Sequence, residues 1–586
     1  MYTLGEKFSD PAQFLIGVEL VTTRGTMADF QALHAREFAG ELIDSPQINW
    51  VSITDNAGGN PQLSPMALGK PILYAGKDVL IHLSCKDFNR NGLESAAWEL
   101  SSEGFHNILA LSGDYPAAGY HGRGKPVFDI DSVGLLTMLD EMNRGLSRPK
   151  PLKSKTGNSD TFEATTFFAG AVATNFKRYE NEVIPQLLKL EKKVQCGAKF
   201  IIAQVGYDAR KSHEMQCYMR ARGIGHIPLI GNVFLLTAAV ARFFRKLTIP
   251  GVVISDSLFE LCEHHAKSPD KGAAFFRELA AKQLAIFRGL GFAGGYLGGV
   301  HHIDDVRAIL ALESSFAKDD WKQFARELQY PMHHEFYYFA QDPSSGLADA
   351  SQLEPAYAKS LKTRPATHNV TLGYRFSKFV HDAAFTPGTA LYNLGRSIYS
   401  NSKQPEQGPR TLRLIEHAAK SAIFSCKDCG DCSLPDIAFL CPESQCAKNQ
   451  RNGPCGGTRD GKCEVHDFEC IWSRAYDRLK YEGREQDMLK HSPVIQDESL
   501  RGTSSWSNTY LEKDHNAHHA HGAASMPLST DKPASMQSHQ SDSPKHSAGE
   551  NPAPRESENV IHVTHSASPG NDPAFRAATP PVQTHR

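Results

Sequence analysis

Three features are missing from this sequence, and each absence excludes a class of protein. No apolar run approaches the roughly 18 residues of a membrane-spanning helix. The first residues, MYTLGEKFSD, contain no basic region followed by an apolar stretch, so a secretion signal is not expected. An excess of one charge is also missing, because 63 basic residues are balanced by 65 acidic ones. That balance gives no overall field for nucleic acid or an anionic membrane, so we expect a soluble cytoplasmic protein that binds neither.

The 12 cysteines are unevenly placed along the 586 residues. Four are scattered through the first half, namely Cys85, Cys196, Cys217 and Cys262. Eight lie within a short segment: Cys426, Cys429, Cys432, Cys441, Cys446, Cys455, Cys463 and Cys470. In a reducing cytosol such a cluster is typical of metal ligands and not of disulfides.

Residues 1–312 alternate short apolar runs with helical patterns such as 182–194 and 272–288. Eight alternations of this kind predict an α/β fold, a (β/α)₈ TIM barrel. A ninth apolar run, 252–255, is interpreted as an insertion beside the barrel. The eight candidate strands are 14–20, 49–53, 79–83, 107–111, 166–172, 200–205, 226–230 and 292–297.

The rest of the chain divides into three further parts. Residues 313–369 form a connecting segment, with a helix expected at 319–328. Residues 370–485 form a smaller helical, cysteine-rich domain, with helices expected at 372–381 and 390–399. Residues 486–586 are rich in His, Ser and Pro with almost no apolar periodicity, which predicts a disordered tail.

Polar residues recur within or just after the candidate strands. A carboxylate after Ser-Gly is typical of a turn, and a strand His is usually a satisfied core residue. Glu19 is a stronger indication of a functional site, because a charge inside a barrel strand is costly to bury unless it is paired or functional. Because barrel sites form where the strands end, these residues together predict one binding site with a general acid. They are Glu19, Thr54, Asp55, Asn56, His82, Asp114, Gln204 and Asn232.

Residues 289–294, GLGFAG, fit the G-x-G-x-x-G pattern of dinucleotide-binding loops. Such a loop must follow a strand and open a helix. Here the pattern follows a predicted helix and opens a predicted strand, so we interpret it as a tight connection between the two.

Four segments of the barrel resemble the methylenetetrahydrofolate reductase family: VSITDNAGGNP, IHLSCKD, GFHNILALSGDYP and LEKKVQCGAKFIIAQVGYD. The resemblance covers about residues 10–312 and implies an oxidoreductase of one-carbon metabolism. It implies that Glu19 is the general acid that protonates N10 of the folate. Asp114 would lie near the flavin and contact the pterin, while Gln204 and Asn232 would contact the folate. The flavin contacts it implies are Thr54, His82, Asp114 and Lys193.

The same resemblance implies FAD or FMN as cofactor and NAD(P)H as electron donor. Two stretches depart from the family pattern: 171–177, where Tyr-Pro and then His are common, and 231–234. Gln186 also stands where an acidic residue is common. These departures leave the flavin type and the electron donor open. A homo-oligomer is expected.

The clustered cysteines follow the spacing C-x₂-C-x₂-C-x₈-C-x₄-C-x₈-C-x₇-C-x₆-C. This spacing predicts metal binding, and either an iron–sulfur cluster or zinc fits it. The segment, above all 452–457 (NGPCGG), resembles the C-terminal domain found fused to some methylenetetrahydrofolate reductases. That resemblance implies an electron-transfer route, with a possible protein partner, or a docking surface.

Three functions are compatible with the sequence. The first is reduction of 5,10-methylenetetrahydrofolate to 5-methyltetrahydrofolate. The second is the reverse oxidation of 5-methyltetrahydrofolate made by a demethylation pathway. The third is a non-catalytic folate-binding scaffold that carries an iron–sulfur or zinc module.

Overall fold

The computed structural model describes residues 3–148, 161–247, 251–404 and 406–516. Eight parallel strands close into one barrel in sequence order, which confirms the predicted TIM barrel. The strands are β1 (Leu15–Leu20), β2 (Trp50–Ile53), β3 (Asp78–Ser84), β4 (Asn107–Leu111), β5 (Phe168–Ala173), β6 (Ile201–Ala203), β7 (Leu229–Phe234) and β8 (Gly294–Gly298).

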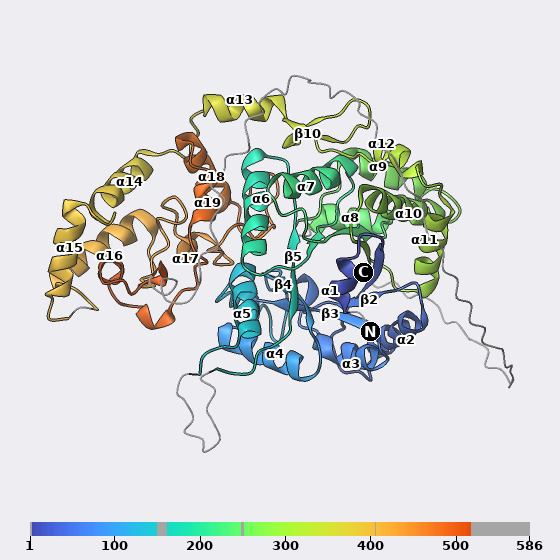
Figure 1. Cartoon of the computed structure of the whole chain (residues 1–586), viewed down its shortest axis with the longest axis horizontal. Coiled ribbons are helices and arrows are strands. Elements are labelled where there is room, and N and C mark those ends of the chain that lie inside the picture. Colours follow the sequence, from blue (N-terminus) through green and yellow to red (C-terminus); the bar gives the residue numbers. More distant parts are fainter. Residues whose placement is uncertain (1–2, 149–160, 248–250, 405, 517–586) are drawn as a thin grey trace, which may run out of the picture. The chain divides into compact units, whose positions relative to one another are not determined.

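Helices follow the strands and cover the outside of the barrel (Figure 1). The helices of this part are α1 (Leu4–Phe8), α2 (Phe30–Asp44), η1 (Ala57–Gly59), α3 (Pro65–Tyr74), α4 (Arg90–Ser102), α5 (Ser132–Arg144), α6 (Glu180–Gln195), α7 (Ala209–Ala221), α8 (Ala238–Leu247), α9 (Asp256–His265), α10 (Ala273–Leu290) and α11 (Ile303–Ser315). Among the described residues, no helix is both long and apolar enough to cross a membrane.

The inside of the barrel has an apolar floor. Its side chains come from alternate residues of the strands, since successive residues of a strand point to opposite faces. Helix α1 closes this floor from below, because Leu4 and Phe8 pack into the same cluster. The floor residues on the strands include Leu15, Trp50, Leu80, Leu109, Ile202, Ile230 and Tyr296, with Phe200 just before β6.

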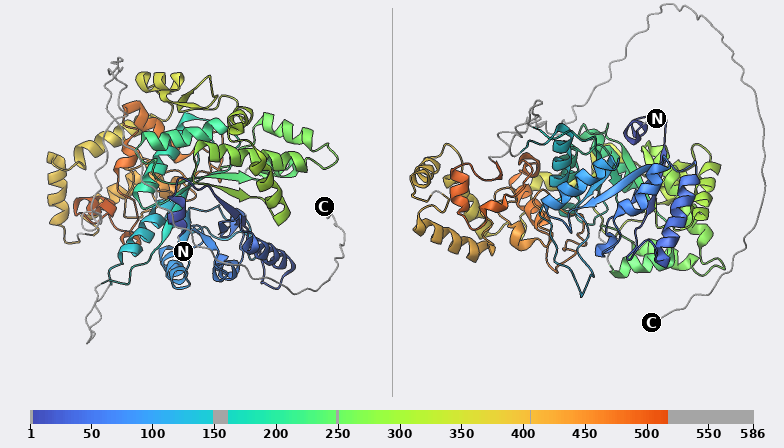
Figure 2. Two further views of the ribbon diagram at one scale, coloured as in Figure 1. Left: turned by 45° about the vertical axis from the view of Figure 1, so that its right-hand side comes forward. Right: turned by 90° about the horizontal axis from the view of Figure 1, so that it is seen from below.

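The chain beyond the barrel is mainly helical and is built on a second apolar core. Val183, Ile184 and Leu187 of α6 pack with Trp472 and Tyr476 of this later part, so the two parts share that core. The elements are α12 (Asp320–Glu327), β9 (Phe339–Gln341), β10 (Ala348–Leu353), α13 (Pro355–Thr363), α14 (Leu372–Ala384), α15 (Ala390–Ser400), α16 (Arg410–Phe424), α17 (Pro442–Gln445), α18 (Ile471–Glu482), α19 (Asp487–Lys490), η2 (Glu498–Leu500) and α20 (Ser505–Tyr510). Figure 2 shows α6 and the orange segments of the cysteine-rich part next to one another in both views.

Several boundaries differ from the sequence expectation. Strand β7 begins and ends later than predicted, so Asn232 lies within the strand and not after it. Residues 252–255 form no strand, and Ser255 caps the N-terminus of α9. The sequence pattern of 289–294 is a connection between α10 and β8, as expected, with Gly291 in the left-handed region at φ 80°.

The predicted disordered tail begins too early. Residues 487–510 contain α19, η2 and α20, so the expectation of disorder from residue 486 is wrong for this stretch. Met488, Leu489 and Tyr510 are buried, which a polar average over the whole segment conceals. Residues 517–586, with His518, His519 and His521, lie outside the described residues.

Candidate functional site

The predicted site residues on the strands share one face, the inside of the barrel. Thr54 and His82 stand four and two residues after the floor residues Trp50 and Leu80, and Asn232 stands two after Ile230. Glu19 stands four residues after Leu15, and Gln204 two after Ile202. An even spacing keeps the side chains on the same face. They therefore form one polar layer above the apolar floor, at the carboxyl ends of the strands.

Glu19 is placed to act as an acid. The hydroxyl of Tyr296 donates to Oε1 of Glu19 at 3.2 Å, across the contact between β1 and β8. A Cβ at Gly298 would lie 3.0 Å from Oε2, a tight contact, so a larger residue there would crowd the Glu19 carboxyl. Burial raises the pKa of Glu19, although Tyr296 and the Gly299 N–H act in the opposite direction. The neutral carboxylic acid is therefore favoured at a pH where a free glutamate is ionised.

His82 is placed as a neutral imidazole. Its Nε2 lies 2.9 Å from the hydroxyl of Ser52 on the neighbouring strand. Burial lowers the pKa of His82 to about 4, so the ring carries no charge at neutral pH. The hydroxyl of Thr54, just beyond β2, accepts a hydrogen bond from the Thr22 N–H at 3.4 Å.

Two carboxylates follow β2 and β4. Asp114 accepts a hydrogen bond from the Gly58 N–H at 2.9 Å, which ties the two loops together. Asp55 accepts one from the Ser84 N–H at 3.1 Å, and burial, with the nearby carboxylate of Asp87, raises its pKa to about 6. Asp114 is half-buried.

Gln204, just after β6, and Asn232, on β7, belong to the same layer, whereas Lys193 lies in the last turn of helix α6. The ammonium of Lys193 donates to the Val172 carbonyl at 2.6 Å, and burial lowers its pKa to about 7. The amide oxygen of Asn232 is buried and has no hydrogen-bond partner within the described residues. Since buried polar atoms are nearly always paired, this oxygen is a candidate ligand contact.

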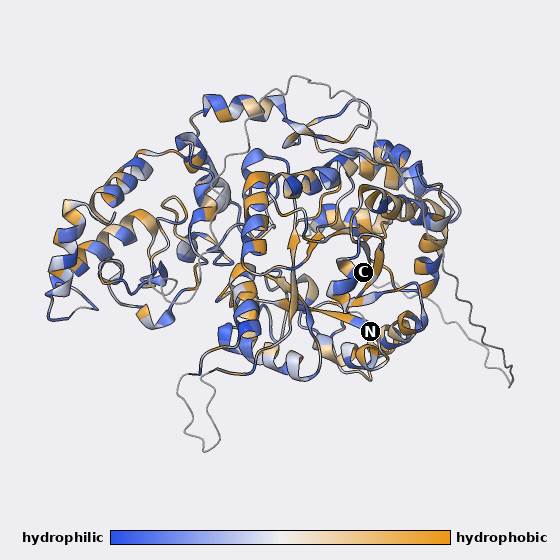
Figure 3. Cartoon of the chain, viewed as in Figure 1, coloured by the Kyte–Doolittle hydropathy of each residue, from blue (hydrophilic) through white to orange (hydrophobic). Residues whose placement is uncertain are grey.

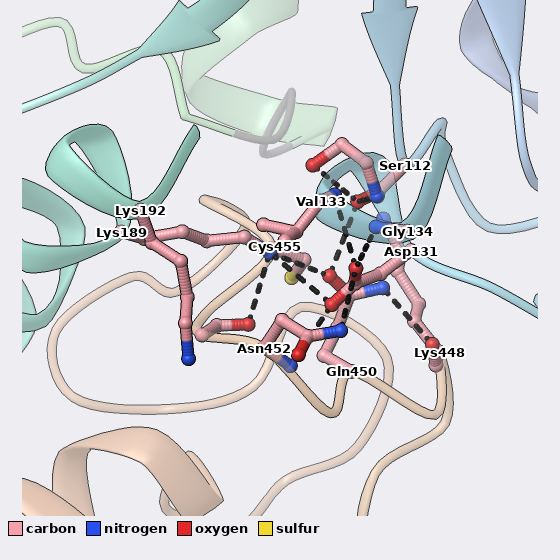
Figure 4. Close-up of polar contacts among 12 residues, drawn as sticks. Ser112, Asp131, Val133, Gly134, Lys189, Lys192, Lys448, Gln450, Asn452 and Cys455 are labelled. Carbon is pink, nitrogen blue, oxygen red and sulfur yellow. Dashed lines mark hydrogen bonds and ion pairs between the residues drawn. The ribbon is translucent and has the colours of Figure 1, made fainter. Parts of the chain in front are cut away.

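Residues missed by the sequence analysis come from the cysteine-rich domain. Residues 448–458 lie against the carboxyl ends of β4 and β5 and the helices that follow (Figure 4). Lys448 donates to the Gly113 carbonyl at 2.8 Å, next to Asp114. Burial alone would lower its pKa, but the carboxylate of Glu464, 2.5 Å away, holds it above the usual range. This loop thus brings a buried cation to the barrel site.

The same loop is anchored by buried hydrogen bonds to three charged residues of the barrel part, Asp131, Lys189 and Lys177. Both the backbone N–H and the side-chain amide of Asn452 donate to Asp131, at 3.0 and 3.1 Å. The ammonium of Lys189 donates to the Gly453 carbonyl at 3.0 Å, and that of Lys177 to the Gly456 carbonyl at 2.6 Å. Charged groups buried in this way are costly to leave unpaired, so the loop and the barrel depend on one another.

The eight clustered cysteines fall into two groups of four, which we name by their distance from the barrel. Burial raises the pKa of Cys426 and Cys429 in one group and of Cys446, Cys455 and Cys470 in the other, and neighbouring thiols of the same group raise it further, to about 12 for Cys429. The distal group, next to α16, comprises Cys426, Cys429, Cys432 and Cys441. The proximal group, which includes the cysteine of loop 448–458, comprises Cys446, Cys455, Cys463 and Cys470.

The sulfur atoms of the eight cysteines are chemically suited to bind a metal. Backbone N–H groups point at sulfur, with 3.4 Å from Asp428 to Cys426 and 3.4 Å from Gly457 to Cys455. Such N–H donors favour the thiolate, which is the form that binds metal. All eight are free cysteines. Among the described residues, no set of three or more His, Cys, Asp or Glu side chains is already arranged as a metal site.

Comparison with known proteins decides the family. Residues 41–285 match the model of methylenetetrahydrofolate reductase, and residues 409–498 match that of the methylene-tetrahydrofolate reductase C terminal. The chain is a methylenetetrahydrofolate reductase barrel fused to that family's C-terminal domain. A curated relative, methylenetetrahydrofolate reductase 2 of Schizosaccharomyces pombe, is 21% identical over 258 residues. That match covers 42% of this chain and only 37% of the relative.

Two solved structures match about half of the chain. One is an uncharacterized protein from Clostridium thermocellum that binds two copies of 5-methyl-5,6,7,8-tetrahydrofolic acid, with 12% identity, a TM-score of 0.37 and coverage of 53% of this chain and 98% of the other. The second is a dihydropteroate synthase from Xanthomonas albilineans, with 12% identity, a TM-score of 0.28 and coverage of 52% and 92%.

Proposed function

We propose that this methylenetetrahydrofolate reductase barrel interconverts 5,10-methylenetetrahydrofolate and 5-methyltetrahydrofolate with the help of a flavin. The observation that carries the proposal is Glu19. Its carboxyl group lies among inward-facing polar side chains at the carboxyl end of a barrel, and its neutral form is favoured by burial. A proton donor at this place is what opening of the folate's five-membered ring requires.

Glu19 and Tyr296 perform the proton chemistry in this proposal. Glu19 gives its proton to N10 of the folate as the bond between N10 and the methylene carbon breaks. Tyr296 holds the Glu19 carboxyl in place through its 3.2 Å hydrogen bond. Reduction then adds a hydride to the methylene carbon and breaks the carbon–nitrogen double bond to N5. Two electrons and two protons enter per folate: NAD(P)H is the source of one hydride, and the second proton comes from Glu19.

The residues present fit a flavin, FAD or FMN. Thr54, His82, Asp114 and Lys193 would hold it, and the flavin would supply the hydride-transfer chemistry. A neutral His82 and a half-exposed Asp114 suit an uncharged ring with hydrogen-bonding edges. Gln204 and Asn232 would contact the folate, and the unpaired amide oxygen of Asn232 supports that assignment.

The two cysteine groups would hold metal, either iron–sulfur clusters or zinc. Each group supplies four sulfurs, which is the number that a zinc tetrathiolate or an iron–sulfur cluster uses. Without metal, burial keeps the Cys455 thiol protonated, with its pKa raised to about 12. A bound cation would offset that cost by stabilising the thiolates.

The test is Glu19→Gln, compared with Glu313→Gln as a control. Glu313 is a carboxylate that pairs with Arg288 on the outside of the barrel. Reoxidation of the reduced flavoprotein by methylenetetrahydrofolate should slow about 10²–10⁴-fold in Glu19→Gln and should not change in Glu313→Gln. The wild-type rate should fall as pH rises through the raised pKa of Glu19, and the Gln variant should lack that fall. Unchanged turnover in Glu19→Gln would reject the assigned acid.

A further inference from the structure

A cavity of about 530 Å³ opens at the amino ends of the barrel strands. Phe14 and Ala293, which directly precede β1 and β8, line it together with Leu229, the first residue of β7. The polar layer that contains Glu19 lies at the opposite, carboxyl ends of the same strands. Small-molecule sites usually have volumes of about 300–1,000 Å³. The cavity is therefore large enough for a small ligand and is separate from the proposed folate site.

Part of the cavity wall is apolar and continues the barrel interior. Phe8, Met219 and Phe292 line the cavity and are buried. Phe8 also belongs to the cluster that forms the barrel floor, so the cavity borders that floor from outside. Figure 3 shows that the strands of the barrel are mostly hydrophobic. Such a wall favours a ligand with an apolar body, because removal of apolar surface from water drives its binding.

One buried polar atom in the wall has no partner. Gln216 of α7 is 7% exposed, and its side-chain N–H donates to the Leu290 carbonyl at 2.9 Å. Oε1 of Gln216 is buried and accepts no hydrogen bond within the described residues. A buried acceptor without a partner is costly, and an N–H or O–H group satisfies it. The ligand that fits this wall therefore carries a hydrogen-bond donor.

An arginine lies one turn further along the same helix. Arg220 stands four residues after Gln216 on α7, so the two side chains leave one helix face about 5.4 Å apart. Arg220 is exposed and makes no hydrogen bond or ion pair within the described residues. His226, also exposed on the wall, has an N–H donor in either protonation state. A guanidinium binds a carboxylate through two parallel hydrogen bonds, so an anionic group fits beside Arg220.

The carboxylates around the cavity do not neutralise Arg220. None of the described residues that line the cavity is Asp or Glu. The other arginine of the wall, Arg288, pairs with Glu313 at 2.6 Å. Asp10, on the loop before β1, accepts a hydrogen bond from the Ala12 N–H at 3.0 Å. The Arg220 guanidinium is thus left for an incoming anion.

The glycine pattern at 289–294 contributes to the wall, but its backbone does not provide donors for an anion. Gly291 and Phe292 line the cavity, and their N–H groups donate to the carbonyls of Arg288 and Phe287, both at 3.0 Å. Glycine-rich loops bind phosphate through free backbone N–H groups. Because these two N–H groups are already used, a carboxylate held by side chains fits this cavity better than a phosphate.

We propose that this cavity binds a small organic carboxylate that has an apolar ring and one hydrogen-bond donor. The carboxylate lies against Arg220, the ring against Phe8 and Phe292, and the donor against Oε1 of Gln216. This second site does not rest on the proposed function, because the apolar floor of the barrel lies between it and the polar layer with Glu19.

The test uses para-hydroxyphenylacetate as the probe, because it has a ring, a carboxylate and one hydroxyl donor. Calorimetry measures its binding to the full chain beside two analogues of similar shape. The analogue para-methylphenylacetate lacks the donor, and para-hydroxyphenylacetamide lacks the charge. We expect each analogue to have a dissociation constant at least about tenfold higher than the probe. Equal binding of either analogue would overturn the assigned contacts.

Two variants assign the contacts to residues. Arg220→Met removes the charge, and its matched control is Arg36→Met, at an exposed arginine of α2 on the outside of the barrel. We expect the dissociation constant of the probe to rise at least about tenfold in Arg220→Met and to stay constant in the control. Gln216→Leu should bind para-methylphenylacetate at least as tightly as the probe. Thermal midpoints report whether each variant is folded, and the comparison of analogues on the wild type tests the Gln216 contact without a mutation.

Three further results would overturn the proposal. They are no binding of the probe by the wild type, unchanged binding by Arg220→Met, or displacement of the probe by 5-methyltetrahydrofolate, which would place the probe in the polar layer. Folate turnover is measured on the same proteins. A wild type that binds the probe without turning over folate would reject only the proposed function, whereas one that turns over folate without binding the probe would reject only this second site.

Discussion

The proximal and distal cysteine groups belong to one domain and contain the same four donors, yet their surroundings differ. The proximal group includes Cys455, and the adjoining carbonyl of Gly456 accepts from the buried Lys177 of the barrel. The distal group is enclosed by its own domain, where the amide of Asn508 donates to the Gly430 carbonyl at 2.9 Å. The difference indicates that the first group is coupled to the folate site, whereas the second is coupled to the outer helices.

We expect the largest difference in folate affinity between the variants Cys455→Ser and Cys432→Ser. Each variant should lose the metal of its own group. Only Cys455→Ser should also weaken folate binding, because a displaced loop removes the carbonyl partners of the buried ammonium groups of Lys177 and Lys189, at a cost of about 1.5–3 kcal/mol for each hydrogen bond. Metal analysis and folate titration would measure both. Equal folate affinity in the two variants would contradict the coupling.

We expect a smaller difference in folate affinity between alanine variants of two buried asparagines. Asn452 lies beside the proximal group and Asn508 beside the distal group. Asn452→Ala removes the side-chain hydrogen bond to the buried Asp131, and Asn508→Ala removes the bond to Gly430. The backbone N–H of Asn452 remains, so each variant should lose about 1–3 kcal/mol of unfolding free energy. Denaturant melts measure that loss.

The two asparagine variants should differ in function more than in stability. Only Asn452→Ala should weaken folate binding, because of the two asparagines only Asn452 binds loop 448–458 to the barrel. If both variants bind folate equally well, the loop does not help to form the site, and the contrast between the two groups fails.

We expect the smallest effect in the pH dependence of the unfolding free energy, through a histidine beside the distal group. His515 is buried between Asp431, 2.5 Å away, and Asp436, 3.1 Å away. Burial would lower its pKa, but these two carboxylates raise it to about 10. The unfolded value is lower, so the stabilisation is complete below about pH 6.5 and is lost as pH rises toward 10.

His515→Gln should flatten that decline, and thermal midpoints measured across the same pH range would reveal it. Folate affinity should not follow this titration, because His515 contacts only the distal side of the domain. A wild-type midpoint that stays constant from pH 6.5 to 10 would exclude a charged His515.

Much of the barrel could be predicted from the sequence, because its signals are local. The eight apolar runs became the eight strands, and even spacing from Leu15 or Leu80 would have shown that Glu19 and His82 face inward. Tyr296 could have been found by the same rule, since it shares the inward face of β8. The sequence analysis treated it only as part of an apolar run.

The contacts of loop 448–458 could not be predicted from the sequence. Lys448 and Gly113 are separated by 335 positions, and no periodicity relates residues so far apart. Asp131 is the N-cap of α5, and it also accepts a hydrogen bond from Asn452. The order beyond residue 486 was missed because a few apolar residues, such as Met488 and Tyr510, stand in a polar segment.

Hydrogen exchange of the full chain with and without 5-methyltetrahydrofolate tests the central claim most directly. The account predicts that the folate slows exchange at the ends of β1 and β4, near Glu19 and Asp114, and in loop 448–458 at the same time. The segment around Cys426 and Cys432 should not change. Protection confined to the distal segment, or none at the barrel strands, would contradict a folate site formed jointly by the barrel and the proximal loop.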